Sequence, residues 1–63
     1  MHTRRSIAEA IREHDPSIAE AIELGLFTDQ EIAEDIRVTA SVSPRFSNKF
    51  YNLLALARAM EEL

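Results

Sequence analysis

Apolar residues recur at helical spacing in four separate stretches of this chain. Isoleucine and alanine alternate with polar residues in residues 7–11, 18–22 and 32–36, at steps of three or four positions. A fourth and longer stretch, residues 46–60, is richer in aromatic residues and leucine. This spacing places apolar side chains on one face of a helix. The pattern predicts an all-α fold, a small bundle of three short helices and one longer C-terminal helix.

Capping signals predict where the first two helices begin and end. Ser6 and Glu9 have the spacing of a capping box, which predicts that the first helix begins at Ser6. It should end just ahead of Pro16, because a residue before proline disfavours helical geometry. Asp15 is then the predicted cap of a second helix that starts at Pro16. Gly25 readily adopts the left-handed conformation of a helix end, so the second helix should stop there.

The third helix has a similar start signal. Thr28 and Glu31 form another capping box, with Phe27 placed to pack on Ile32 as a hydrophobic staple. Leu26 and Phe27 are expected to fold back onto the core after the second helix ends. The third helix then directs Ile32, with the apolar residues that follow it at helical spacing, toward the core.

The last helix is predicted to run from Pro44 to about Glu62, with Ser43 as its cap. Its apolar residues follow a heptad-like period, and further apolar residues widen that surface. Three short helices cannot cover so much apolar surface, so we expect a second subunit to bury part of it in a homodimer. The alternative is simple packing inside a monomeric bundle. The predicted dimer interface consists of Phe50, Leu53, Leu54, Ala57 and Met60.

Length and composition limit the remaining possibilities. The chain has 63 residues and no cysteine, which predicts a single small helical domain over residues 1–63 without disulfides, with a flexible basic N-terminus at residues 1–5. No stretch approaches the roughly 20 apolar residues of a membrane span, and the expected location is the cytoplasm. The sequence contains no metal-ligand cluster, no phosphate-binding glycine loop and no nucleophile motif. We therefore expect no cofactor, no metal, no small-molecule substrate and no enzymatic activity.

Residues 31–43 carry the most specific pattern in the chain. Their order, E-I-A-x-x-I-x-V-T-x-S-V-S, resembles the helix-turn-helix of bacterial, phage and archaeal transcription regulators. A weaker, partial likeness extends over residues 16–46. In that family the first helix carries a small residue where the helices cross, and the second lies in the DNA major groove. The resemblance implies that Ala33 is the crossing residue and that Val38 and Val42 are buried.

The sequence departs from this family pattern in three respects. The segment from Val38 to Val42 is one residue shorter than the family spacing, and two positions carry unusual residues. Arg37 stands where the turn usually has glycine, and Pro44 would interrupt a recognition helix. If Ser43 and Pro44 instead begin the last helix, residues 37–43 form a linker and the motif is an ordinary helical hairpin. The sequence is therefore compatible with a turn, a strand or part of a recognition helix at residues 38–42.

Charge is distributed unevenly along the chain. The net charge is −4, yet residues 9–35 contain nine acidic side chains and the single base Arg12, whereas residues 36–60 contain four bases and no acid. The second half of the chain can therefore face phosphate, because a nucleic acid responds to local potential. Together with the resemblance, this charge distribution predicts that the protein has a surface that binds double-stranded DNA. The predicted contacts are Arg37, Thr39, Ser41, Ser43, Arg45, Asn48 and Lys49.

Two functions follow from these patterns. The first is a dimeric, helix-turn-helix-like, DNA-binding transcription regulator. The alternative is an acidic protein–protein interaction module, such as an adaptor, an antitoxin-like partner or an inhibitor of a nucleic-acid-binding protein, which would engage a basic protein through its acidic helices. That acidic surface extends from Glu9 to Asp35, and reversing the charge of Glu20, Glu23, Glu31 and Glu34 would test it.

Overall fold

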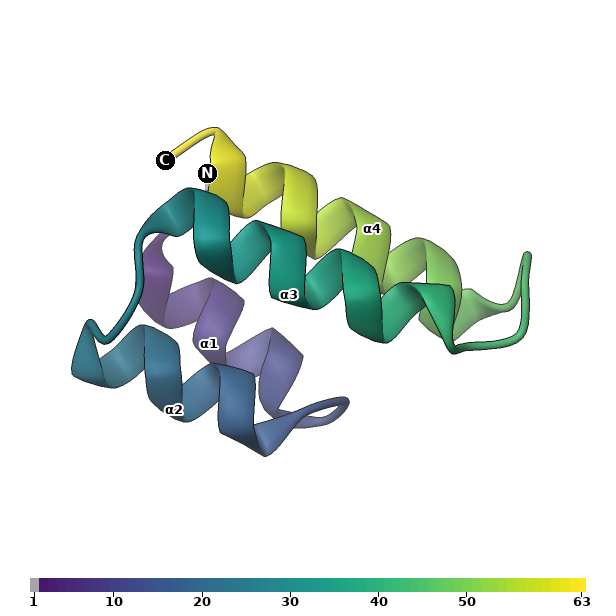
Figure 1. Cartoon of the computed structure of the whole chain (residues 1–63), viewed down its shortest axis with the longest axis horizontal. Coiled ribbons are helices and arrows are strands. Elements are labelled where there is room, and N and C mark those ends of the chain that lie inside the picture. The colour runs from purple at the N-terminus through teal and green to yellow at the C-terminus, as the bar shows by residue number, and fades with distance from the viewer. Residues whose placement is uncertain (1) are drawn as a thin grey trace.

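Four α-helices form two antiparallel hairpins in the computed structural model, which describes residues 2–63 (Figure 1). The helices are α1 (Arg4–Arg12), α2 (Pro16–Leu24), α3 (Asp29–Ser41) and α4 (Asn48–Glu61). α1 packs along α2, and the longer α3 packs along α4. The hairpins meet through α1 with α4 and α2 with α3. The described residues contain no strand, so the predicted all-α fold is confirmed.

The core lies between the two hairpins. Its largest fully buried side chains are Ile7, Ile11, Ile32, Ile36, Leu53 and Met60. The isoleucine pairs of the first and third stretches therefore point inward, as their spacing predicts. Buried alanines on α1, α2 and α3 accompany them, and their small side chains let neighbouring helices approach closely.

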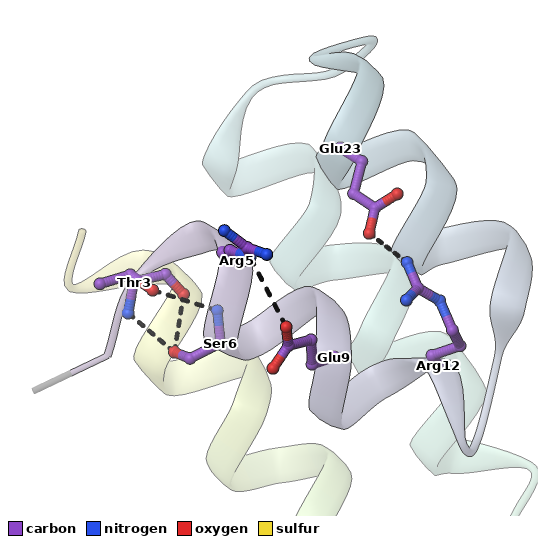
Figure 2. Close-up of polar contacts among 6 residues, drawn as sticks. All are labelled: Thr3, Arg5, Ser6, Glu9, Arg12 and Glu23. Carbon is purple, nitrogen blue, oxygen red and sulfur yellow. Dashed lines mark hydrogen bonds and ion pairs between the residues drawn. The ribbon is translucent and has the colours of Figure 1, made fainter.

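The first helix begins earlier than predicted. Thr3, not Ser6, is the N-cap: its Oγ1 accepts from the Ser6 backbone N–H at 3.1 Å, and Ser6 Oγ accepts from the Thr3 N–H at 2.9 Å (Figure 2). Thr3 offers the same hydroxyl chemistry as Ser6, and the added turn still buries Ile7. Arg4 and Arg5, which belong to the N-terminal segment predicted to be flexible, lie in the first turn of α1; Met1 lies outside the described residues.

The predicted limits of α2 are confirmed. Asp15 Oδ1 accepts from the backbone N–H groups of Ser17 and Ile18 at 3.1 and 3.4 Å, and Pro16 is the first helical residue. Gly25 ends the helix at φ 65°, in the left-handed region. The expectation that Leu26 and Phe27 fold back onto the core is wrong, because both side chains are exposed.

The capping box at the start of α3 is also confirmed. Thr28 Oγ1 accepts from the Glu31 N–H at 3.2 Å, and Glu31 Oε1 accepts from the Thr28 N–H at 3.1 Å. The backbone hydrogen bond from Thr28, followed by the one from its side chain, lowers the pKa of the Glu31 carboxyl below its ordinary value of 4.5.

Removing this cap should destabilise the protein measurably. We expect Thr28→Ala to lower the free energy of unfolding by about 1 kcal/mol, measured by urea denaturation at neutral pH.

Because the pKa of Glu31 is lowered on folding, its carboxylate stabilises the fold above about pH 4.5, and this contribution disappears as the pH falls through the lowered pKa. The difference in Tm between the wild type and Glu31→Gln should therefore shrink on acidification. A difference that is independent of pH would contradict this role.

α3 and α4 form a helical hairpin, but the connection between them lies later in the chain than either alternative drawn from the sequence predicts. α3 continues without a turn through Arg37 to Ser41, so residues 37–41 are neither a helix-turn-helix turn nor an extended linker. α4 begins at Asn48, with Ser47 Oγ accepting from the Phe50 N–H at 3.1 Å, and not at Pro44. The expected burial of the two valines of this segment is also wrong. Ile36 and Ala40 occupy the inward face of α3, so the valines at 38 and 42 point to solvent.

Candidate nucleic-acid interface

Arg37, the first residue of the predicted DNA-binding set, forms ion pairs with carboxylates of its own chain. Its guanidinium forms ion pairs with Glu61 on α4 and, at 3.6 Å between Nη1 and Oε2, with Glu34 on its own helix. It joins the middle of α3 to the end of α4. Two carboxylates close to one guanidinium neutralise its attraction for phosphate.

The three predicted hydroxyl contacts are also used locally. Thr39, Ser41 and Ser43 each donate a side-chain hydrogen bond to a backbone carbonyl three or four residues earlier, at 3.1, 2.6 and 3.3 Å. Such bonds are common for hydroxyl residues in and just after helices. The hydroxyl protons of all three residues are therefore donated to backbone carbonyls of α3.

Arg45, Asn48 and Lys49 form the other part of the set, and they lie together. All three are exposed, on the loop that joins α3 to α4 and on the first turn of α4. This region, residues 42–51, is defined here as the α3–α4 tip. The tip lies at one end of the long axis, and the α3–α4 hairpin extends there beyond the α1–α2 hairpin (Figure 1).

Ion pairing distinguishes Arg45 and Lys49 from the other basic residues. Among residues 2–63, Arg45 and Lys49 form no ion pair. The other five bases each contact a carboxylate: Arg4 with Asp29, Arg5 with Glu9, Arg12 with Glu23, Arg37 with Glu34 and Glu61, and Arg58 with Glu62. Free positive charge in the described chain is therefore concentrated at the α3–α4 tip.

The α1–α2 hairpin illustrates how the remaining charges are neutralised (Figure 2). Arg5 and Glu9 pair along α1, with 3.6 Å between Nε and Oε1, and Arg12 reaches across to Glu23 on α2. A hollow lined by Arg4, Arg5, Ile22 and Glu23 lies beside these pairs. Because every charged side chain in its lining is already paired, this hollow has no free group with which to bind a charged ligand.

An aromatic cluster at the α3–α4 tip was not assigned to binding from the sequence. The rings of Phe46, Phe50 and Tyr51 lie with centroids 5.6 to 6.3 Å apart. The sequence signal was present, since three of the four aromatic residues fall within six positions and alternate with Arg45 and Lys49. Helical periodicity assigned Phe46 and Phe50 to an apolar seam instead. α4 begins after Phe46, which leaves that ring outside the helix.

No protein-family model, curated protein or solved structure matches this chain. Within residues 2–63, no helix is both long and apolar enough to cross a membrane. The same residues contain no cluster of three or more histidine, cysteine or acidic side chains able to hold a metal ion. The α3–α4 tip is therefore identified as a candidate site from its geometry and charge alone.

The predicted dimer interface is divided between the core and the surface. Leu53, Ala57 and Met60 are fully buried within the chain's own core, where a second copy cannot reach them in this fold. Phe50 is half-buried at the α3–α4 tip, and Leu54 is 37% exposed. Of the five predicted interface residues, only Phe50 and Leu54 are available to another subunit.

Proposed function

We propose that this protein is a small nucleic-acid-binding regulator that contacts phosphate groups through its α3–α4 tip. The observation that carries this proposal is the pair of exposed bases, Arg45 and Lys49, without ion pairs among residues 2–63. An overall charge of −4 does not oppose it, because nine of the eleven acids lie in residues 9–35, outside the tip. A nucleic acid that approaches the tip meets a locally positive surface.

The start of α4 adds groups suited to contacts with bases. Asn48, Lys49 and Asn52 are exposed within its first five residues. In helix-turn-helix proteins the N-terminal residues of the second helix contact base edges, and amide and ammonium groups donate hydrogen bonds to purines. The helices that form the tip are α3 and α4, joined by residues 42–47.

A salt titration tests the proposal. The double variant Arg45→Ala, Lys49→Ala should bind a labelled oligonucleotide more weakly than the wild type. The slope of log affinity against log salt should fall by roughly 0.7 to 0.9 for each phosphate contact removed. Fluorescence anisotropy from low to moderate salt measures both quantities.

Arg58→Ala is the matched control. Like Lys49→Ala, it removes one positive charge from α4, but this side chain is 83% exposed and pairs with Glu62, one turn further along the helix. Its salt slope should remain close to that of the wild type. An equal loss in the control would mean that the attraction is general and not localised at the tip. Absence of wild-type binding at about 50 mM salt would exclude the proposed function, since non-specific attraction is strong there.

The alternative, an acidic protein-interaction module, has less support from the arrangement of carboxylates. Glu23 and Glu34 form ion pairs, and Glu31 caps α3. Of the four glutamates chosen to test that surface, Glu20 alone has neither an ion pair nor a capping bond among residues 2–63. Three of the four carboxylates thus already stabilise the fold, and a protein partner would have to compete for them.

A further inference from the structure

Two exposed aromatic rings at the α3–α4 tip need an explanation beyond phosphate binding. Phe46 is 73% exposed and Tyr51 is 51% exposed, and their ring centroids lie 6.1 Å apart. Phe50 packs edge-on against both rings and is itself half-buried against the core. Phe50 therefore supports both exposed rings from the side of the core. Their exposure to solvent is unfavourable, because large aromatic groups are apolar.

The backbone at Phe46 is held in an unfavourable conformation. Its φ of 63° is the only positive φ among the non-glycine residues described. The Ser47 N–H donates to the Pro44 carbonyl at 3.2 Å and closes a turn in which Phe46 takes a position that usually requires glycine. A bulky residue in this conformation is strained, and Phe46 gains little burial in return. Strain of this kind is typical of binding sites, where the direction of a side chain matters.

The charges beside the rings indicate what binds there. Arg45 immediately precedes Phe46, and Lys49 immediately precedes Phe50. Exposed aromatic rings with neighbouring cations in the sequence suit single-stranded nucleic acid, whose bases stack on aromatic side chains while its phosphates meet basic groups. A duplex keeps its base faces stacked inside, so it would use the cations and leave the rings in water. A symmetric contact with a second copy would bring like charges together.

We propose that the α3–α4 tip binds single-stranded nucleic acid, with unpaired bases stacked on Phe46 and Tyr51 and the adjoining phosphates held by Arg45 and Lys49. This inference rests on the proposed function and names its ligand more closely. It assigns the rings to base contact and the cations to backbone contact, so the two pairs of residues should affect binding in different ways.

The chain provides its own probe for the test. Tyr51 is the only tyrosine and there is no tryptophan, so tyrosine emission reports on the tip alone. We would titrate the full chain with a thymidine oligomer of about 12 nucleotides, within the span that small single-strand-binding folds contact. The duplex of this oligomer with its adenine complement is the comparison. The single strand should quench Tyr51 and bind roughly tenfold more tightly than the duplex.

Substitution of Phe46 separates stacking from electrostatics. Phe46→Ala should weaken single-strand binding roughly tenfold, while the salt slope stays unchanged because no phosphate contact is lost. Phe46→Gly should weaken it equally, and since glycine accepts a positive φ, this variant should melt no lower than the wild type. Phe27→Ala is the matched control: Phe27 is 46% exposed, on the connection between α2 and α3. Its binding should be unchanged.

The outcomes distinguish this inference from the function beneath it. If the duplex binds as tightly as the single strand, or if Phe46→Gly binds like the wild type, the stacking role is overturned and the phosphate-binding role remains. If neither nucleic acid binds at low salt, both fail. If Tyr51 emission changes with protein concentration alone and sedimentation shows association lost in Phe46→Gly, a second copy occupies the rings and the inference is overturned.

Discussion

Leu53→Asp should unfold this protein. Leu53 is fully buried in α4, among the isoleucines of the other helices. A carboxylate placed there without a partner costs several kcal/mol. A single core in a chain of this length rarely supplies more than about 3–5 kcal/mol of net stability. The free-energy cost of the buried carboxylate should therefore exceed the free energy of unfolding. Far-UV circular dichroism should show loss of helix, and the cooperative thermal transition should disappear.

The next residue in the chain is the control. Leu54→Asp introduces the same charge one position later, where the side chain is 37% exposed. It should keep the helical spectrum and a cooperative melt. If Leu54→Asp also unfolds the chain, or if Leu53→Asp retains a normal melt, the inward face of α4 is assigned incorrectly.

The same pair of variants tests the homodimer that we propose from the sequence. In this fold its contact on α4 would include Leu54, since Leu53 belongs to the core. Sedimentation should then give a dimer for the wild type and a folded monomer for Leu54→Asp. A wild-type monomer, or an unchanged mass in the variant, would contradict an interface on this part of α4.

Arg37→Pro should lower the free energy of unfolding by about 3 kcal/mol or more. Arg37 lies inside α3, which runs from Asp29 to Ser41. Proline there removes a backbone hydrogen bond and clashes with the preceding turn. Arg37→Gly should cost about 1 kcal/mol, because glycine loses more conformational freedom in a helix. Urea denaturation followed by circular dichroism measures both values.

Arg37→Ala separates the backbone effect from the ion pairs. It removes the contacts with Glu34 and Glu61, which lie at the surface and contribute at most about 1 kcal/mol. Alanine is also the best helix former, which offsets part of that loss. A helix-turn-helix with its turn at this position predicts a different order, since glycine is the usual turn residue there. Arg37→Gly at least as stable as Arg37→Ala would therefore contradict a continuous α3.

The length of α3 decides which residues are available for binding. Because the helix continues to Ser41, the hydroxyl groups predicted to contact DNA bond to their own helix, and the loop moves to residues 42–47. The exposed bases Arg45 and Lys49 then stand next to the exposed rings.

Local features of the fold follow from the sequence because they depend on neighbouring residues. Helical spacing identifies the buried isoleucines, and Asp15, Pro16 and Gly25 determine the limits of α2. Cap chemistry alone does not choose between two suitable hydroxyl residues. The sequence favours Ser6 over Thr3 and Ser43 over Ser47, because each pair offers the same hydrogen-bonding group a few positions apart.

The tertiary structure alone decided where free charge and exposed rings gather. Arg12 pairs with Glu23 eleven positions away, and Arg37 pairs with Glu61 across 24 positions. These two pairs form only when two helices pack side by side, so helical periodicity and capping signals do not predict them. The sequence by itself therefore determined four amphipathic helices and a basic second half. Packing between helices paired three of the seven basic residues, Arg4, Arg12 and Arg37, whereas Arg5 and Arg58 pair within their own helices at a spacing of four residues. Among residues 2–63, Arg45 and Lys49 form no ion pair and lie in the same tip as the aromatic cluster.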